Sequence, residues 1–428
     1  MRPSTRAASS APSSKWCAGA ELAERPDPRR ELLLGLLRAG LQRVDGRGCV
    51  RAALTELAPR PARVWLAAIG KAAESMALGA HEALGAAIEQ TLLITRDPPS
   101  AAPFLAGGGA VEVLLGAHPV PDERSLAAGA RLLTWVDTLP PEAQPMFLIS
   151  GGASSLVEVL EAGATLHDLE ELTRQAFAQG IAIGELNARR AALSRIKGGR
   201  LAARLHGRPA RALFVSDVPQ DDPRVIGSGL MGPASRGADQ VERQVVASVD
   251  HAVAAVAAAA AELGLSVHAP ARRFEGNAMR LAARFAHELS LTSAQLCVWG
   301  GESTVQVPPH PGRGGRNQHL ALAAARLIAG HTDLMLLAAG TDGIDGVTED
   351  AGAVIDADTC ARLALAALDA DRCLQQADSA RALAASGDLV HTGPTGTNVG
   401  DLVIGLKLPA AAARALADRH GGTRSRVL

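Results

Sequence analysis

Short apolar segments that run directly into glycine-rich or polar turns dominate the first half of this chain of 428 residues. Three of these segments, at residues 64–69, 146–149 and 213–216, end at the turns Gly70-Lys71, Ser150-Gly151-Gly152 and Ser216-Asp217. Strands that alternate with helices predict an α/β fold with a largely parallel sheet. Because ligands bind at the carboxyl ends of such strands, we expect the three turns to share one functional edge of the sheet.

The other elements of the first half continue this alternation. Asp122 is placed to cap a helix that continues to Val136. The remaining expected strands and helices cover residues 92–95, 111–115, 166–179 and 181–194. Residues 234–290 are rich in alanine and predict a mainly helical segment.

A second α/β unit is expected to begin near residue 295. Its predicted strands cover residues 295–299, 334–337 and 402–406. Gly300-Gly301 is interpreted as a turn that leads to a hairpin partner over residues 304–307. The glycines within 312–315 precede an amphipathic helix that continues to Ile328.

The length of the chain predicts more than one domain, because single domains hold about 100–200 residues. We place the first domain over residues 26–270 and the second over residues 290–410. Residues 1–25 are rich in Ser, Ala, Pro and Arg, which predicts a disordered leader. A transit peptide is the alternative interpretation of this leader.

The composition argues against several classes of partner. Lys and Arg total 43 and Asp and Glu total 44, so the net charge of -1 argues against nucleic acid and anionic lipid. No apolar run reaches the roughly 18–20 residues of a membrane helix. The five cysteines lack CxxC spacing, which argues against a zinc ribbon or a disulfide framework and favours a reducing, cytoplasmic location.

Two glycine motifs have part of a nucleotide-binding signature without its context. Gly227 to Gly232 has the spacing GxGxxG, but a dinucleotide site needs a strand before this motif and a helix after it. Pro233 closes the motif, so we interpret it as a loop. Gly70-Lys71 is followed by Ala72 and lacks the upstream glycine of a Walker A loop.

Several turns of the first half carry residues that suit an anionic ligand. Lys71 follows a strand at the start of a helix, where its charge adds to free backbone N–H groups. Without side chains, Gly151 and Gly152 let backbone amides approach a phosphate. Lys197 stands before a glycine pair and a helix. Each feature alone also fits an ordinary surface turn.

The second half adds acidic residues and another cation. Arg316 lies where a loop with three glycines becomes a helix, a position suited to gripping a carboxylate or phosphate. Glu302 and Asp342 lie in glycine-rich turns, and Asp217 ends a strand of the first half. Acids at such places hold magnesium or accept a proton from an attacking hydroxyl. Anion-binding loops, acids and cations together predict phosphoryl transfer.

At the level of these motifs the chain resembles the glycerate 2-kinase family. In the family's order, the motifs are AIGKAA (68–73), GAHPVPD (116–122), SGGASSL (150–156), LNARRAALSRIKGGRLA (186–202), FVSDVPQDDP (214–223), GSGL (227–230), GGESTV (300–305), GRGGRNQ (312–318), AAGTDGIDG (338–346) and TGPTGTNVGDL (392–402). The resemblance implies a Rossmann-like glycerate kinase domain at the N-terminus. It also implies a smaller C-terminal α/β domain, MOFRL, with a mixed sheet.

The resemblance further implies a reaction and its participants. The family transfers the γ-phosphoryl group of ATP to D-glycerate, giving 2-phosphoglycerate, and needs a divalent cation, usually Mg²⁺. Lys71 and Arg316 correspond to the family's essential cations, one from each domain. The implied nucleotide contacts are Ser150, Gly151, Gly152, Ser154, Asn187 and Lys197.

The resemblance leaves the roles of the acids open. Asn317 and Asn398 are expected to bind the substrate beside Lys71 and Arg316. We assign Glu302 and Asp342 to Mg²⁺ and Asp217 to proton acceptance, although each of the three acids is a candidate for either role.

The chain departs from the family pattern at three places. It reads SGGASS where many members have a third glycine, Pro219-Gln220 where many have Gly next to Asp, and Gly229-Leu230-Met231 where Gly-Pro-Thr is common. These departures leave the exact hydroxy-acid open. There are two alternative functions: an NAD(P)H-dependent hydroxypyruvate reductase, and a non-catalytic protein that binds phosphorylated metabolites. For the assembly, a homodimer is one arrangement that the sequence leaves open.

Overall fold

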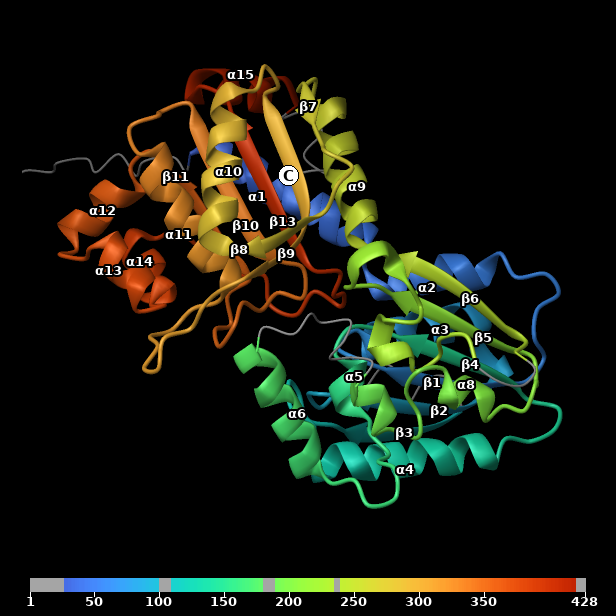
Figure 1. Ribbon diagram of the computed structural model, residues 1–428. Helices are drawn as coiled ribbons and strands as arrows, with labels where there is room; N and C mark the ends of the chain where they lie inside the picture. Colours follow the sequence, from blue (N-terminus) through green and yellow to red (C-terminus); the bar gives the residue numbers. More distant parts are fainter. Residues whose placement is uncertain (1–26, 100–108, 180–188, 235–238, 421–428) are drawn as a thin grey trace, which may run out of the picture.

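The first unit of the structure is built on a six-stranded parallel sheet (Figure 1). The computed structural model describes residues 27–99, 109–179, 189–234 and 239–420. The strands are β1 (Val64–Ile69), β2 (Ile88–Thr95), β3 (Ala110–Leu115), β4 (Gln144–Ile149), β5 (Ala210–Val215) and β6 (Val241–Ala247). Their order is β3-β2-β1-β4-β5-β6 and every pair is parallel. This order confirms the predicted Rossmann-like fold, in which the strand order reverses between β1 and β4.

Helices cover both faces of this sheet because its central strands are apolar on both sides. In β1, Leu66 and Ala68 pack into one core cluster, whereas Ala67 and Ile69 pack into the other. The helices of the unit are α2 (Gly46–Thr55), α3 (Ala73–Leu84), α4 (Glu123–Asp137), α5 (Ala153–Leu156), α6 (Leu166–Gln179) and α8 (Arg200–Ala203). As predicted, Asp122 caps α4, and with Ser125 it forms a reciprocal capping box.

The segment predicted to be mainly helical also contains strands, and that prediction was wrong in part. Strand β6 and the short strands β7 (Val267–His268) and β8 (Phe274–Asn277) accompany α9 (Val249–Glu262) and α10 (Ala278–Leu291). Strand β6 forms one edge of the first sheet. Because edge strands expose one side, its first residues alternate between exposed and half-buried, and three polar residues in succession hide the strand from a search for apolar runs.

The second unit is built on a mixed sheet of seven strands, as the resemblance implied. Its remaining strands are β9 (Leu296–Thr304), β10 (Leu334–Gly340), β11 (Gly352–Asp356), β12 (Leu389–Val390) and β13 (Asp401–Lys407). The order is β12-β11-β10-β13-β9-β7, with β8 also paired to β9. The pairs of β13 are antiparallel, whereas β7 and β8 run parallel to β9.

Gly300 and Gly301 lie inside strand β9, so the predicted turn and its hairpin partner were wrong. Strand β9 continues through both glycines and ends at Thr304. A Cβ at Gly301 would collide with the carbonyl oxygen of Phe274 in β8, and one at Gly300 would lie 2.6 Å from Val249 in α9. These glycines therefore serve close packing between elements and do not turn the chain.

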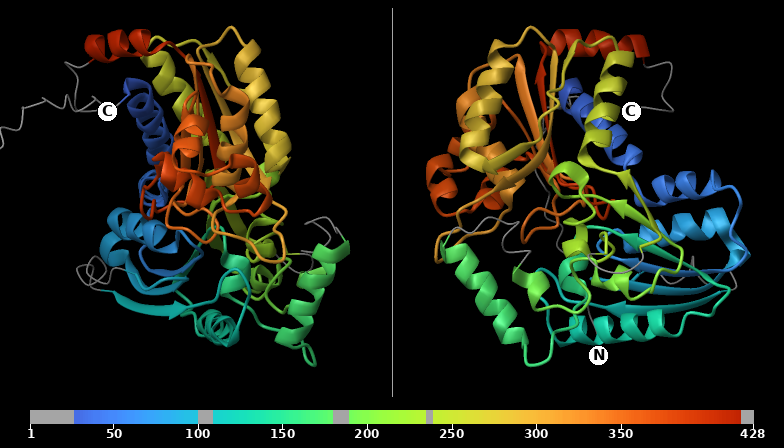
Figure 2. Two further views of the ribbon diagram at one scale, coloured as in Figure 1. Left: turned by 90° about the vertical axis from the view of Figure 1, so that its left-hand side faces the viewer. Right: turned by 45° about the vertical axis from the view of Figure 1, so that its right-hand side comes forward.

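Helices from distant parts of the chain cover the second sheet. Helix α10 and helix α11 (Arg316–Ile328) pack on one face and contribute to one core cluster. Helix α1 (Pro28–Arg43) and α9 pack on the other face, where Gly40 of α1 lies against Val256 and Leu402 (Figure 2). The other helices are α12 (Thr359–Leu365), α13 (Ala370–Gln375), α14 (Ser379–Ser386) and α15 (Ala410–His420).

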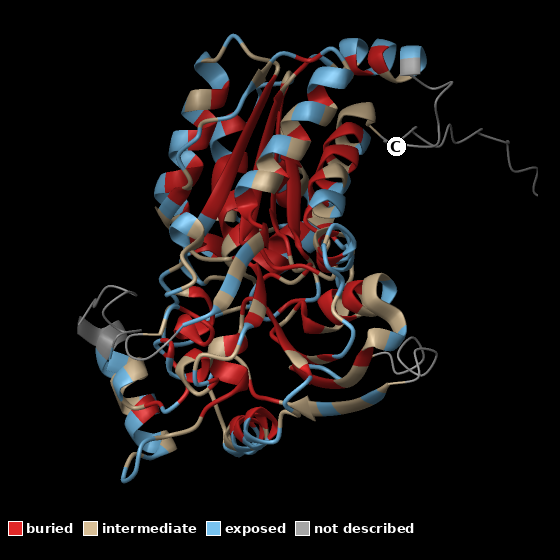
Figure 3. Ribbon diagram, turned by 90° about the vertical axis from the view of Figure 1, so that its right-hand side faces the viewer, coloured by how far each residue is buried: buried red, intermediate tan, exposed pale blue. Residues whose placement is uncertain are grey.

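Two helices assigned from the sequence to the first domain thus contact the second sheet. The domain limits of 26–270 and 290–410 stay predictions, and the expected leader at 1–25 lies outside the described residues. Figure 3 shows that the central strands of both sheets are buried, whereas edge strand β3 is exposed or half-buried and the helices expose their outer faces. Among the helices that the structure describes, none is both long and apolar enough to cross a membrane.

Candidate active site

Lys71 lies at the point where the strand order of the first sheet reverses. The turn after β1 and the turn after β4 touch each other there: the backbone N–H of Lys71 donates to the carbonyl oxygen of Gly151 at 2.9 Å. The hydroxyl of Ser150 accepts a hydrogen bond from the N–H of Ala72 at 3.0 Å. Gly70 has a φ of +131°, and a Cβ on it would collide with Ser150. This close contact fixes the backbone from which the Lys71 side chain extends.

Asp217 follows the neighbouring strand β5 and closes the same edge. A Cβ on Gly151 would collide with the carboxylate of Asp217 and with the side-chain amide of Asn398. That amide donates to Asp217 Oδ2 at 3.1 Å from the second unit. The prediction that the turns at 70, 150 and 217 share one edge is therefore confirmed.

A second contact between the units joins Lys71 to Asp342. The ammonium of Lys71 lies 2.8 Å from Asp342 Oδ2, and the two side chains are 23% and 16% exposed. Asp342 follows β10, and Asn398 comes just before β13. These two strands are neighbours in the second sheet. Each unit thus offers a carboxylate to a donor of the other, which brings residues 271 positions apart into one site.

Arg316 is the first residue of α11 and is held by two carboxylates. It pairs with Glu302 at the outer end of β9, and its Nε lies 2.8 Å from Asp401 Oδ2. A further bond joins Arg316 Nη2 to Asp401 Oδ1 at 3.0 Å. The carboxylate of Asp401 has no exposed surface, so the guanidinium supplies the charge that stabilises it.

Asn317 and Asp345 support the start of α11 from the interior. Asp345 accepts the backbone N–H groups of Asn317 at 3.1 Å and Gln318 at 2.7 Å, as a carboxylate at a helix N-terminus does. Asn317 Nδ2 donates to Asp401 at 3.0 Å. Asn317 is only 1% exposed, so the structure places it behind Arg316 and facing these acids.

Burial and nearby charges shift two pKa values at the site. Burial raises the pKa of Asp217 to about 6; the negative charge of Glu302 adds to this rise, while Lys71 and Arg316 oppose it. These four groups from both units therefore act on one another. Burial also lowers the pKa of His118 to about 4, and Lys71 contributes, so His118 is neutral near pH 7.

Sequence reasoning missed three residues of this site. His118 lies beside Gly152, where a Cβ would come within 3.1 Å of its ring and 3.2 Å of Lys71 Cγ. Asp345 and Asp401 hold Arg316 and its helix. All three lie within motifs that carry the family resemblance, and each directly follows or precedes a glycine, alanine or proline turn. Only their partners, distant in the sequence, distinguish them from solvated loop residues.

Three of the predicted nucleotide contacts are not among the residues that contact one another in this site: Lys197 and Ser154 have other partners, and Asn187 is not described by the structure. Lys197 is 1% exposed and forms a buried ion pair with Glu158, and burial lowers its pKa. Ser154 is half-buried, and its hydroxyl lies 2.6 Å from that of Ser228. Asn187 falls outside the described residues.

The GxGxxG segment forms a loop, as interpreted from the sequence. Residues Ile226–Gly229 form a short 3-10 turn, with Gly227, Ser228 and Gly229 all at positive φ. Within the described residues around it, no strand leads directly into the segment and no α-helix begins after Gly232. The arrangement differs from the strand–turn–helix of a dinucleotide site.

No preformed metal cluster stands among the residues that the structure describes. No group of three or more His, Cys, Asp or Glu side chains in residues 27–99, 109–179, 189–234 and 239–420 is arranged to hold an ion. Glu302 and Asp342 each pair with a cation instead. This donor set fits Mg²⁺ that arrives with a nucleotide, because Mg²⁺ is usually bound by about one or two carboxylates together with substrate phosphates.

The Gly151→Ala substitution tests the contact between the two units. The added methyl group would push Asp217 and Asn398 apart, so we expect turnover to fall by about 100-fold or more, as when an active-site group is misplaced. Gly48→Ala in helix α2 is the control, because its Cβ meets only the end of the Asp45 side chain. Steady-state kinetics and a thermal melt of both variants make the measurement, and full activity in Gly151→Ala would contradict the assignment.

Comparison with known proteins connects this geometry to a family. Residues 32–262 match a domain of unknown function, DUF4147, and residues 295–401 match the MOFRL family. A D-glycerate 2-kinase from Thermotoga maritima is 33% identical over 420 residues, covering 89% of this chain and 99% of the relative. The crystal structure of glycerate kinase from Thermotoga maritima has a TM-score of 0.78 at 32% identity, covering 90% and 100% of the two chains.

A second name occurs among similar proteins. A putative hydroxypyruvate reductase from Agrobacterium vitis is 34% identical over 336 residues, which cover 69% of this chain and 87% of the relative. The two matched domains and the similarity over nearly the full length of the Thermotoga enzyme decide the assignment. The chain belongs to the glycerate 2-kinase family.

Proposed function

We propose that this protein is a glycerate 2-kinase that transfers the γ-phosphoryl group of ATP to D-glycerate. The observation that carries the proposal is the pair of contacts between the units, from Asn398 to Asp217 and from Lys71 to Asp342, at a site where Lys71 and Arg316 both lower the pKa of Asp217. Phosphoryl transfer depends on positioning and on neutralising phosphate charge, which two fixed cations provide. The similarity to a D-glycerate 2-kinase over 99% of that enzyme supports the choice of substrate.

Asp217 is proposed to accept the proton of the attacking hydroxyl. Its pKa of about 6 keeps it mostly deprotonated at neutral pH while leaving it more basic than an ordinary carboxylate. The bond from Asn398 orients this carboxylate. The side chain of Lys71, released from Asp342, would then be free to bind the substrate carboxylate or the transferred phosphoryl group.

Nucleotide phosphates are proposed to lie against the turn at residues 150–152. Gly152 has a φ of +82°, and the turn presents backbone amides next to Lys71. Mg²⁺, when bound with the nucleotide, would be held by Glu302 and Asp342 and would neutralise charge on the phosphates. Asn317 is proposed to act through Arg316, because it is buried behind that side chain.

The location and assembly of the protein are also proposals. We propose a cytoplasmic enzyme, and the free thiols of Cys49, Cys297, Cys360 and Cys373 support a reducing compartment. A homodimer, and the absence of nucleic-acid or membrane partners, stay predictions from the sequence.

Product formation separates the kinase from the reductase. With D-glycerate, ATP and Mg²⁺ we expect ADP release in a coupled assay and a phosphorus NMR signal of 2-phosphoglycerate. With hydroxypyruvate we expect no NADH oxidation, because the GxGxxG segment lacks the context of a dinucleotide site. Absence of ADP release with D-glycerate would overturn the proposed function, and NADH oxidation would favour the reductase.

Substitution of either cation should lower turnover strongly, with different effects on stability. Lys71→Ala and Arg316→Ala should each lower kcat/KM by about 100-fold or more, as removal of a charge-stabilising donor does. Lys71→Ala should leave the thermal melt nearly unchanged, since its ion pair lies in a partly exposed cleft. Arg316→Ala should cost about 3 kcal/mol of stability, because Asp401 is left buried without its partner. Wild-type kinetics in either variant would remove that residue from the mechanism.

The pH dependence should report Asp217. The deprotonated carboxylate is the active form, so kcat/KM for D-glycerate at saturating MgATP should fall as the pH drops through about 6. Asp217→Asn should lose turnover at every pH. Asp217→Glu should keep part of the turnover, and its kcat/KM should fall at a different acidic pH. A rate that is constant between about pH 5 and 8 would contradict this role.

A further inference from the structure

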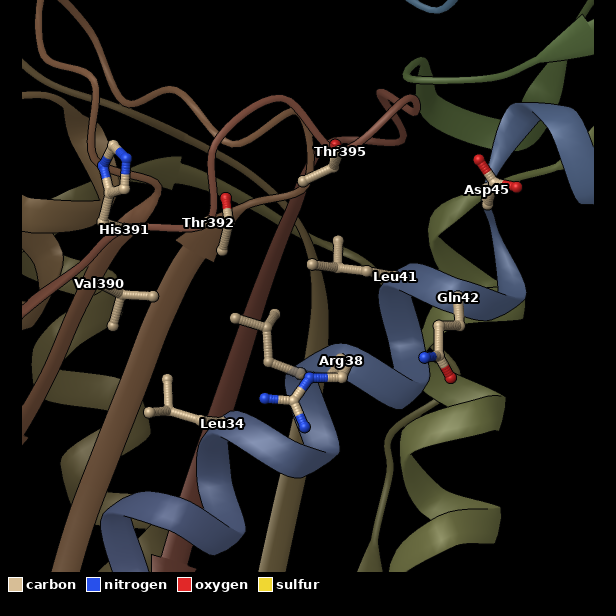
Figure 4. Close-up of a pocket in the computed structure, with 10 residues that line it drawn as sticks. Leu34, Arg38, Leu41, Gln42, Asp45, Val390, His391, Thr392 and Thr395 are labelled. Atoms are coloured by element: carbon tan, nitrogen blue, oxygen red, sulfur yellow. The ribbon is translucent and has the colours of Figure 1, made fainter. Parts of the chain in front are cut away.

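A groove between α1 and the segment after β12 lies next to the candidate site (Figure 4). Its floor is apolar: Leu34, Leu37 and Leu41 come from α1, and Val390 comes from the end of β12. Arg38 lies on the same side of α1, and Thr395 forms part of the opposite wall. Nothing in the proposed mechanism uses these residues.

The groove shares one lining residue with a smaller cavity at Lys71. Thr395 lines both hollows, and its hydroxyl donates to the carbonyl oxygen of Thr341 at 2.5 Å. Thr341 directly precedes Asp342, the partner of Lys71. Thr395 therefore links the groove to the cation of the site.

The two hollows differ in volume, so they fit different parts of a ligand. The cavity at Lys71 measures about 80 Å³, too small for a nucleotide. The groove measures about 550 Å³, within the roughly 300–1,000 Å³ of small-molecule sites. Lys71 and Arg96 line the small cavity, each paired with an acid that also lines it, so phosphates would reach these cations by displacing Asp342 and Asp97. The apolar floor of the larger groove suits an uncharged, flat group.

We propose that the groove binds the nucleoside of the phosphoryl donor, with the phosphates passing Thr395 toward Lys71. This inference rests on the proposed kinase function. A purine ring would pack against the leucines of α1, and the exposed guanidinium of Arg38 would stack on it, as arginine does on aromatic faces. Thr392 and Thr395 line the groove, and their hydroxyl oxygens, which donate to the carbonyl oxygens of Gly393 and Thr341, can accept hydrogen bonds from the ribose or the base.

Binding of ATP and of tripolyphosphate, which lacks the nucleoside, tests the assignment by calorimetry. The wild-type protein should bind ATP more tightly than tripolyphosphate. Leu34→Trp, which fills the groove, and Arg38→Ala, which changes only an exposed side chain, should each weaken ATP binding by about tenfold, as loss of about 1.4 kcal/mol does. Tripolyphosphate binding should stay unchanged in both variants.

Leu327→Trp is the matched control, because Leu327 is 50% exposed on α11, away from the groove. The inference would be overturned if Leu34→Trp and Arg38→Ala left the ratio of the ATP affinity to the tripolyphosphate affinity unchanged, whether both affinities stayed the same or both fell equally. Failure of the wild-type protein to bind ATP would overturn it too. Because the titration needs no D-glycerate and no turnover, its outcome is distinct from failure of the glycerate kinase assay.

Discussion

The contact between the turn after β1 and the turn after β4 is the constraint on which the rest of the site depends. Parallel strands end at the same edge, but only glycine at 70 lets these two turns approach so closely, and only glycine at 151 leaves space for Asp217 and Asn398. The approach fixes the backbone of Lys71 and leaves room for Asp217 and Asn398 to meet beside it. One backbone contact thus positions a cation, an acid and the second unit.

The second unit positions its cation by a different physical device. Asp401 is buried without exposed surface, and a buried carboxylate is stable only when it is paired and hydrogen-bonded. Arg316 and Asn317 satisfy it, and Asp345 holds the start of their helix. Lys71 is therefore fixed by backbone geometry, whereas Arg316 is fixed by the cost of leaving a charge unpaired.

Both cations carry acidic partners: Asp342 for Lys71, and Glu302 with Asp401 for Arg316. Anionic substrates must compete with these partners. Asp342 and Glu302 are partly exposed and can exchange, but buried Asp401 stays in place. The proposed substrate therefore displaces only the outer carboxylates and leaves the framework around Arg316 intact.

The sequence by itself determined five of the six strands of the first sheet, its largely parallel character and the turns that carry Lys71, Asp217 and Arg316, because apolar periodicity and glycine turns are local properties. Only the tertiary structure decided that Gly300 and Gly301 pack within a strand, that α1 covers the second sheet, and that Lys197 pairs with Glu158 in the interior. Lys71 and Lys197 both stand beside glycine turns. What separates them is burial and charge pairing, which come from residues far away along the chain and leave no local mark in the sequence.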